Sequence, residues 1–385
     1  MMETNGTLNG EMKEKKLFTP GPLGVSLSTK QAMLRDLGSR DTEFIHMVKY
    51  IREQLVQLAG VSLDDYTCVP IQGSGSFAVE AVLTTSIPCN NGKLLLLENG
   101  AYGKRMGQIA DVLGVDYKVV SFPETSQVCI EMVQKLLQED NSWTNVAIVH
   151  CETSSGVINP VEEVGKLVKE YVPDAFYIVD AMSSFGAIPL NLDTIHADFM
   201  VSSANKCLEG VPGFSYAIAK KTSLQKCKGW SRSLCLDLVA QWEGLEKTGQ
   251  FRFTPPTHAM LAFNQALMEL HKEGGITGRS KRYQENRRVL QEGMKAMGFK
   301  ELLDDSHKGY IITSYYYPDQ EKFDFKEFYT KLQSKGQVIY PGKVTKANCF
   351  RIGNIGHLFP EDMRLLLTCI REVCYEMGIT LPLEK

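Results

Sequence analysis

The sequence has little that would attach it to a membrane or to a nucleic acid. No uninterrupted apolar run approaches the roughly 20 residues needed to cross a bilayer, and residues 1–16 contain no apolar segment like that of a secretory signal. The 42 Lys and Arg residues nearly balance the 45 Asp and Glu residues, so the net charge is only −3. We therefore expect a cytoplasmic protein without a membrane or nucleic-acid partner.

Patterns for metal binding and for disulfides are missing too. The ten cysteines include no C-x-x-C pair, and the seven histidines form neither H-x-x-x-H nor H-E-x-x-H. Most of the cysteines lie inside apolar runs, as Cys151 and Cys369 do. This favours buried free thiols in a reducing compartment, and no metal site, over a disulfide framework or a zinc site.

The chain is long enough for more than one domain. With 385 residues, 43% of them hydrophobic, it can bury a sizeable core in about two or three domains. Residues 1–16 are polar and predict a disordered tail. We expect a large domain over residues 17–257 and a smaller one over residues 258–385, because Pro255-Pro256 marks a natural boundary.

From about residue 65, short β-branched runs alternate with amphipathic segments. The predicted strands are Cys68–Ile71, Lys93–Leu97, Tyr117–Val120, Val146–His150, Phe176–Val179, Phe199–Val201 and Phe214–Ala219. The predicted helices between them are Phe77–Thr85, Gly103–Leu113, Ile130–Gln138 and Val161–Glu170. This alternation predicts an α/β fold, with a mainly parallel seven-stranded sheet between helices.

After residue 257 the pattern changes to that of a smaller α+β unit. Two long helices are predicted over Ala259–Lys272 and Thr277–Met297, and a terminal helix over Pro360–Met377. Strands are predicted at Gly309–Tyr317 and Val338–Tyr340.

Ligand-binding and catalytic residues are expected at the carboxyl ends of the strands of a parallel sheet. The segment Gln72-Gly73-Ser74-Gly75-Ser76-Phe77 follows one strand and starts a helix. Its glycines allow close approach, and a helix N-terminus attracts anions, so it could hold a phosphate or be an ordinary N-cap turn. It matches neither the dinucleotide fingerprint nor the P-loop.

Two further strand ends carry charged residues. Asp180 ends the strand Tyr177-Ile178-Val179, and Lys206 follows Ser202-Ser203-Ala204-Asn205. Each residue alone could be a turn cap or a loop residue. Together with the segment Gly73-Ser74-Gly75-Ser76, which we call the phosphate cup, they match what pyridoxal phosphate requires. The cup offers donors for its phosphate, the lysine reacts with its aldehyde and the acid faces its ring nitrogen.

Longer motifs carry a family resemblance. Five segments are similar to motifs of fold-type I, class V pyridoxal-phosphate aminotransferases: Leu17-Phe18-Thr19-Pro20-Gly21-Pro22, Asp180-Ala181-Met182-Ser183-Ser184-Phe185-Gly186, Ser203-Ala204-Asn205-Lys206-Cys207, Tyr340-Pro341-Gly342-Lys343 and Cys349-Phe350-Arg351-Ile352-Gly353-Asn354. Within this class the motifs resemble those of the aminotransferases that act on 2-aminoethylphosphonate and pyruvate. The resemblance extends from about residue 17 to residue 375.

The resemblance implies roles for individual residues. Lys206 would be the catalytic lysine, and Asp180 the partner of the ring nitrogen. The other cofactor-binding residues would be Ser74, Gly75, Ser76, Tyr102, Thr153 and Thr254. Thr254 would reach the phosphate of a neighbouring subunit, which implies a homodimer with the active site at its interface. Arg351 would bind the acid group of the substrate.

The expected reaction is transamination of 2-aminoethylphosphonate with pyruvate, which gives phosphonoacetaldehyde and L-alanine. An alanine– or serine–glyoxylate aminotransferase of the same class is the alternative. A cysteine desulfurase is less favoured, although Cys349 stands near Arg351, because Tyr102 occupies the position of the stacking histidine found in those enzymes.

Overall fold

The computed structural model describes residues 14–383. Residues 1–13 of the predicted tail lie outside the described residues. Lys16, at the end of that tail, lies in strand β1 (Lys16–Leu17), which pairs in parallel with β12 (Gln337–Val338). The first described residues are therefore held by a segment near the other end of the chain.

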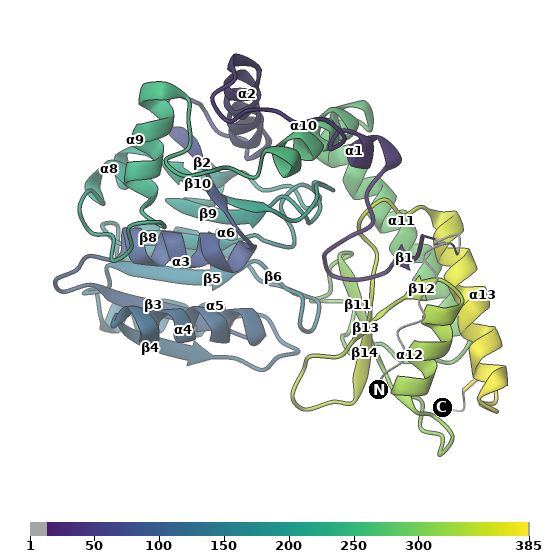
Figure 1. Cartoon of the computed structure of the whole chain (residues 1–385). Coiled ribbons are helices and arrows are strands. Elements are labelled where there is room, and N and C mark those ends of the chain that lie inside the picture. The colour runs from purple at the N-terminus through teal and green to yellow at the C-terminus, as the bar shows by residue number, and fades with distance from the viewer. Residues whose placement is uncertain (1–13, 384–385) are drawn as a thin grey trace, which may run out of the picture.

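A seven-stranded sheet forms the centre of the larger part of the molecule (Figure 1). In sheet order its strands are β2 (Tyr66–Gln72), β10 (Phe214–Lys220), β9 (Phe199–Ser203), β8 (Phe176–Asp180), β5 (Asn145–Val149), β3 (Lys93–Glu98) and β4 (Asp116–Ser121). Strand β10 runs opposite to the other six strands, which all point in one direction. The predicted mainly parallel sheet of seven strands is confirmed.

Apolar runs explain why these segments form the sheet. All four leucines of β3 are at most 1% exposed, as expected for a strand that is covered on both faces. The predicted helices are found as α3 (Gly75–Ser86), α4 (Ala101–Leu113), α5 (Ile130–Glu139) and α6 (Val161–Tyr171). The alternating pattern did not identify the helices α1 (Leu27–Gln31), α2 (Thr42–Leu58), α7 (Leu192–Ile195), α8 (Lys221–Lys226) and α9 (Leu238–Thr248).

The C-terminal part combines helices with a small antiparallel sheet of order β11-β14-β13, on the right of Figure 1. Its predicted helices are found as α10 (Thr257–Lys272), α11 (Gly275–Ala296) and α13 (Pro360–Glu376), and one that was not predicted is α12 (Phe325–Ser334). The strands are β11 (Ile312–Tyr316), β14 (Cys349–Gly353) and β13 (Tyr340–Pro341). The single strand predicted at residues 338–340 is divided between β12 and β13, and β14 was not predicted.

Separate apolar clusters stabilise the two parts. The larger one surrounds the seven-stranded sheet, and a second one lies among α11, α12, α13 and the three-stranded sheet. Phe18 belongs to the second cluster, although it is near the start of the chain. The domain boundary at residue 257 stays a prediction.

The sequence predicts no membrane-spanning segment and favours buried free thiols over disulfides. Among residues 14–383, no helix combines the length and the apolar character needed to span a bilayer. All ten cysteines lie in this range and are unpaired, and seven of them are buried.

Candidate active site

The strand ends that carry the predicted site residues meet at one edge of the sheet. Strand β10 is antiparallel to both β2 and β9, so β2 points in the same direction as β9 and β8. A cavity of about 210 Å³ lies where these strands end. It brings together the predicted residues Ser74, Gly75, Ser76, Tyr102, Asp180 and Lys206.

The cup after β2 is the start of helix α3. Ser74 is the N-cap residue, but its side chain does not cap the helix by a hydrogen bond. Arg105 donates from Nη1 to Ser76 Oγ over 3.1 Å, so a guanidinium stands beside the helix start. A Cβ on Gly75 would lie 2.3 Å from the sulfur of Met182, so a larger residue here would require the Met182 side chain to move. A helix N-terminus with an adjacent guanidinium suits a phosphate.

Asp180 is a buried acid at the end of β8. Its carboxylate accepts a hydrogen bond from the Met182 N–H over 2.8 Å, and among the described residues it forms no ion pair. Burial raises the pKa of Asp180 to about 6. A buried carboxylate facing a cavity fits a cationic ring nitrogen, which would lower its pKa again.

Lys206 is a buried amine that follows β9. Its Nζ donates to the Pro20 carbonyl oxygen over 2.7 Å. Burial lowers the pKa of Lys206 to about 8, and the nearby Asp180 opposes this shift. A Cβ on Gly21 would lie 2.5 Å from Nζ, and Gly21 has a φ of +117°, so the N-terminal segment approaches the amine closely through a glycine.

Tyr102 lies in the first turn of α4 and is held there by a buried carboxylate. Glu152 Oε2 accepts hydrogen bonds from the N–H groups of Tyr102 and Gly103, over 3.1 and 3.4 Å. Glu152 Oε1 accepts from the Ser154 hydroxyl over 2.6 Å. Glu152 belongs to the hairpin of β6 (Cys151–Glu152) and β7 (Val157–Ile158), so this hairpin positions Tyr102 at the cavity.

Arg351 and Thr153 are joined to each other but do not line the cavity of about 210 Å³. Arg351, on β14, is 2% exposed and donates from Nη1 to the Thr153 carbonyl oxygen over 2.6 Å and from Nε to that of Pro341 over 2.9 Å. Burial lowers its pKa. Within residues 14–383 no carboxylate forms an ion pair with Arg351. The Oγ1 of Thr153 is buried without a partner in the same range.

Thr254 lies beside the end of β2 but outside the cavity that most of the other predicted residues line. It is exposed on the loop before α10, and its carbonyl oxygen accepts a hydrogen bond from Gln72 Nε2 over 3.1 Å. It does not line the cavity of its own chain.

Some residues at the site were not predicted. Val79, Arg105, Met182, Ser203 and Asn205 also line the cavity. Ser203 and Asn205 stand in the segment that identified Lys206, and the buried Ser203 Oγ has no partner among the described residues. Arg105, like Arg40 and Lys104, was a candidate for contact with the phosphonate by its charge alone, and equally a candidate surface residue. Nothing in the sequence marked Glu152 as buried.

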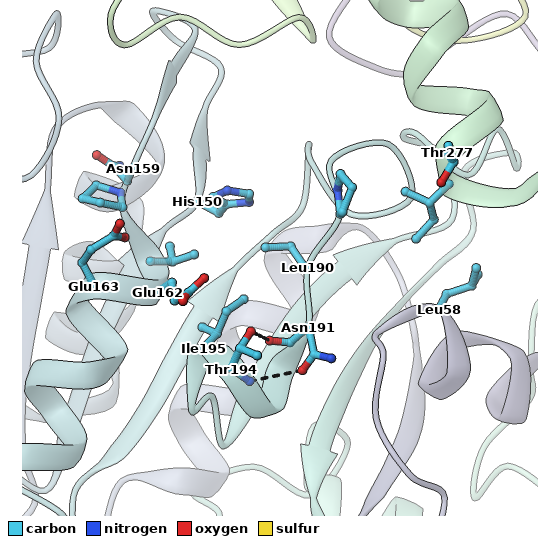
Figure 2. Close-up of a pocket in the computed structure, with 14 residues that line it drawn as sticks. Leu58, His150, Asn159, Glu162, Glu163, Leu190, Asn191, Thr194, Ile195 and Thr277 are labelled. Carbon is cyan, nitrogen blue, oxygen red and sulfur yellow. Dashed lines mark hydrogen bonds between the residues drawn. The ribbon is translucent and has the colours of Figure 1, made fainter.

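A larger cavity, of about 450 Å³, lies elsewhere (Figure 2). Its lining comes from the start of α6, the segment around α7 and the start of α11, and contains no lysine or arginine. His150 lines it, but its Nδ1 is 2.8 Å from Ser184 Oγ, and burial lowers its pKa to about 4, so the ring is neutral. This cavity has no cation for a phosphate, whereas the smaller one does.

The chain is similar to known aminotransferases over most of its length. The family described as aminotransferase class-V matches residues 26–336. A 2-aminoethylphosphonate–pyruvate transaminase of Bacteroides fragilis is 50% identical over 366 residues, which are 94% of this chain and 100% of the relative. One of Klebsiella pneumoniae is 50% identical over 361 residues, which are 93% and 97% of the two chains.

Solved structures share the fold. An alanine–glyoxylate aminotransferase from Nostoc sp. superposes with a TM-score of 0.87 at 23% identity, over 97% of this chain and 99% of the other. A pyridoxamine–pyruvate aminotransferase from Mesorhizobium loti gives 0.86 at 24% identity, over 97% and 95%. The family match spans most of the chain, and the fold and the strand-end site agree with it. The chain belongs to the class-V aminotransferase family.

Proposed function

We propose that the protein transfers the amino group of 2-aminoethylphosphonate to pyruvate with pyridoxal phosphate as its cofactor, and that it forms phosphonoacetaldehyde and L-alanine. The similarity to transaminases of that name over 94% of the chain supports this reaction. The structural observation that carries it is Arg351, a buried guanidinium without an acidic partner among the described residues. Both substrates carry an anionic group that could pair with it.

Lys206 and Asp180 perform the central tasks in this proposal. The cofactor, when bound, withdraws electrons from the carbon that bears the substrate nitrogen. Asp180 keeps the ring nitrogen protonated, because a buried carboxylate is stabilised by a cation beside it. Lys206 Nζ takes the proton from that carbon, and its pKa of about 8 leaves part of the amine neutral near pH 7.

The remaining cofactor-binding residues hold the cofactor in place. Ser74, Gly75 and Ser76 would donate to the phosphate at the start of α3, and Tyr102 would cover the ring. Thr153, whose buried Oγ1 has no partner in residues 14–383, would donate near the ring hydroxyl. Thr254 reaches the phosphate of a second subunit, so the protein is a homodimer. We also propose that it acts in the cytoplasm.

Arg351 binds the acid group of each substrate in turn. Its planar guanidinium presents paired donors that suit a carboxylate and a phosphonate equally. Two backbone carbonyls already fix its orientation, so the free side of the group is preorganised.

The experiment measures alanine formation from pyruvate by the cofactor-loaded protein. We expect turnover with 2-aminoethylphosphonate and little with serine or with glyoxylate as acceptor. Lys206→Ala should abolish turnover, while Lys228→Ala, which removes an exposed lysine paired with Glu243, should leave it unchanged. Borohydride reduction and peptide mapping should locate the cofactor on Lys206.

Two results would contradict the proposal. Substantial turnover by Lys206→Ala would remove the lysine from its role. A preference of the wild-type protein for serine and glyoxylate would make the glyoxylate-type reaction the correct one.

A further inference from the structure

Basic side chains gather around Tyr102 at the active site. Lys343 Nζ lies 4.5 Å from the centroid of the Tyr102 ring, and the guanidinium carbon of Arg105 lies 5.3 Å from it. Arg351 lies close by: its guanidinium carbon is 5.0 Å from the centroid of the Tyr340 ring, and it donates to the carbonyl oxygen of Thr153, next to the Glu152 that holds Tyr102. Within residues 14–383 none of the three cations forms an ion pair with a carboxylate.

This arrangement is unfavourable without a ligand. Lys343 is half-buried, and burial together with the charges of Arg105 and Arg351 lowers its pKa. Unpaired cations that lose water and repel one another destabilise a fold unless an anion joins them. Arg105 already stands beside Ser76 at the site of the cofactor phosphate, so Lys343 and Arg351 remain as two neighbouring cations for a ligand with two negative charges.

Lys343 is also held in place rather than free at the surface. It follows β13, whose Pro341 accepts a hydrogen bond from Arg351 Nε. The Gly342 N–H donates to the Cys349 carbonyl oxygen over 3.1 Å, and a Cβ on Gly342 would lie 2.2 Å from that oxygen. On the other side of Lys343, the Thr345 N–H donates to Glu124 over 2.8 Å. These anchors fix the loop next to Arg351.

We propose that Lys343 makes the site select a phosphonate over a carboxylate: its ammonium group binds the second negative charge of a phosphonate whose first charge is held by Arg351. This inference rests on the proposed function. A carboxylate carries one charge and is satisfied by Arg351 alone, whereas a phosphonate dianion is matched by two cations. Pyruvate therefore does not require Lys343, and 2-aminoethylphosphonate does.

The test uses unreactive probes that differ only in the acid group. Ethylphosphonate and propionate are titrated into the cofactor-loaded protein, and their dissociation constants are measured by calorimetry. Lys343→Gln should weaken ethylphosphonate about tenfold and propionate less than twofold, as expected for the loss of one charge-assisted hydrogen bond. In turnover, the KM for 2-aminoethylphosphonate should rise about tenfold while that for pyruvate stays nearly constant.

Two variants serve as controls. Lys343→Arg keeps the charge and should restore most of the affinity for ethylphosphonate. Lys346→Gln removes an exposed lysine from the same loop and should leave both probes unchanged.

The outcomes separate this inference from the proposed function. Equal weakening of both probes by Lys343→Gln, or no weakening of either, would overturn the role of Lys343. Failure of the wild-type protein to form alanine from 2-aminoethylphosphonate would instead overturn the proposed reaction. The probe measurements do not depend on turnover, so they remain informative in either case.

Discussion

At the scale of single residues, the site contains two buried ionisable groups of opposite charge, the acid Asp180 and the amine Lys206. Burial favours the neutral forms of both Asp180 and Lys206, since it raises the pKa of the acid to about 6 and lowers that of the amine to about 8. The cofactor-free protein therefore maintains at neutral pH a carboxylate that its surroundings disfavour. A cationic ring nitrogen beside Asp180 would remove this penalty.

Asp180→Asn should stabilise the cofactor-free protein at neutral pH. The folded pKa lies above the unfolded value of about 4, so stability falls as the pH rises from about 4 to about 6, and the full penalty persists above about 6. The variant should gain about 1–3 kcal/mol in the free energy of unfolding at pH 7.5 and bind the cofactor less tightly. Urea unfolding at pH 7.5 and pH 4 measures this difference.

The exposed Asp174→Asn is the matched control and should change little at either pH. An Asp180→Asn variant that is no more stable than the wild type at pH 7.5 would show that the Asp180 carboxylate is not penalised by burial.

The sequence identified those site residues that directly follow a predicted strand. Asp180 and Lys206 could be identified because each follows an apolar strand, where ligands bind in parallel sheets. Glu152 could not, because only the folded chain shows which carboxylate becomes buried. Lys343 stood in a segment that carried the family resemblance, Tyr340-Pro341-Gly342-Lys343, but only the folded chain shows that it lies over Tyr102.

At the scale of elements, the hairpin β6–β7 and helix α4 act as one support for Tyr102. The Glu152 carboxylate is fully buried and spans from Ser154 in the hairpin to the first N–H groups of α4. A Cβ on Gly100 would lie 2.4 Å from Glu152 Cγ, so the helix can start this close only because glycine precedes it. A carboxylate at a helix N-terminus also interacts favourably with the helix dipole.

Glu152→Gln should loosen the start of α4. The amide has one acceptor oxygen in place of two, so either Ser154 or the N–H groups of Tyr102 and Gly103 lose their acceptor. We expect hydrogen exchange at Tyr102 and Gly103 to become about tenfold faster, which corresponds to about 1.4 kcal/mol. Native-state exchange followed by mass spectrometry or NMR measures this.

Glu163→Gln removes an exposed acid from the first turn of α6 and serves as control, with unchanged exchange in α4. If Glu152→Gln left the exchange of Tyr102 and Gly103 unchanged, Glu152 would not be what holds this helix start.

The prediction of elements succeeded where a pattern was long or repeated. Six strands of the large sheet were found because each is an apolar run bounded by a helix or a turn, and the mostly exposed edge strand β4 was found through its β-branched Val119 and Val120. Strand β14 was missed because a buried arginine interrupts its apolar sequence. The structure shows how the strand accommodates a buried arginine: two backbone carbonyl oxygens accept hydrogen bonds from Arg351.

At the scale of the whole molecule, a buried ionic network joins the loop of Lys206 to the C-terminal part. Glu209 is 4% exposed, and its Oε1 accepts from Arg282 Nη2 over 2.7 Å and from the Tyr283 hydroxyl over 2.5 Å. Arg279, also on α11, lies 3.4 Å from the same oxygen. Arg282 further donates to the Gly356 carbonyl oxygen over 2.7 Å.

Glu209→Ala should destabilise the protein strongly. Arg279 and Arg282 then keep only Glu273 as an acidic partner among the described residues, so part of their buried charge is left uncompensated, which costs about 3 kcal/mol. Urea unfolding measures the loss. Glu285→Ala, which breaks the exposed pair with Arg288, should cost no more than about 0.5 kcal/mol. Similar losses in the two variants would contradict a special role for the Glu209 network.

The arrangement of the whole chain was the least predictable level. The sequence placed a boundary near residue 257, but it contained no sign that Lys16 and Leu17 would pair with Gln337 and Val338. Pairing between segments so far apart follows from packing in three dimensions, as with Phe18 in the C-terminal core, and local patterns do not encode it.

This long-range pairing sets an order of events during synthesis. The carbonyl that binds the Lys206 amine belongs to Pro20, and the segment carrying it is fixed by bonds from Phe18 to Val338 and from Gly353 to Phe18. A growing chain emerges from its N-terminus, so these anchors are absent until nearly all of it has been translated. The Pro20 segment can therefore be fixed over Lys206 only after the ribosome has made nearly the whole chain. An aldehyde that reacts with Lys206 then meets the complete surroundings of this amine only in the full-length polypeptide.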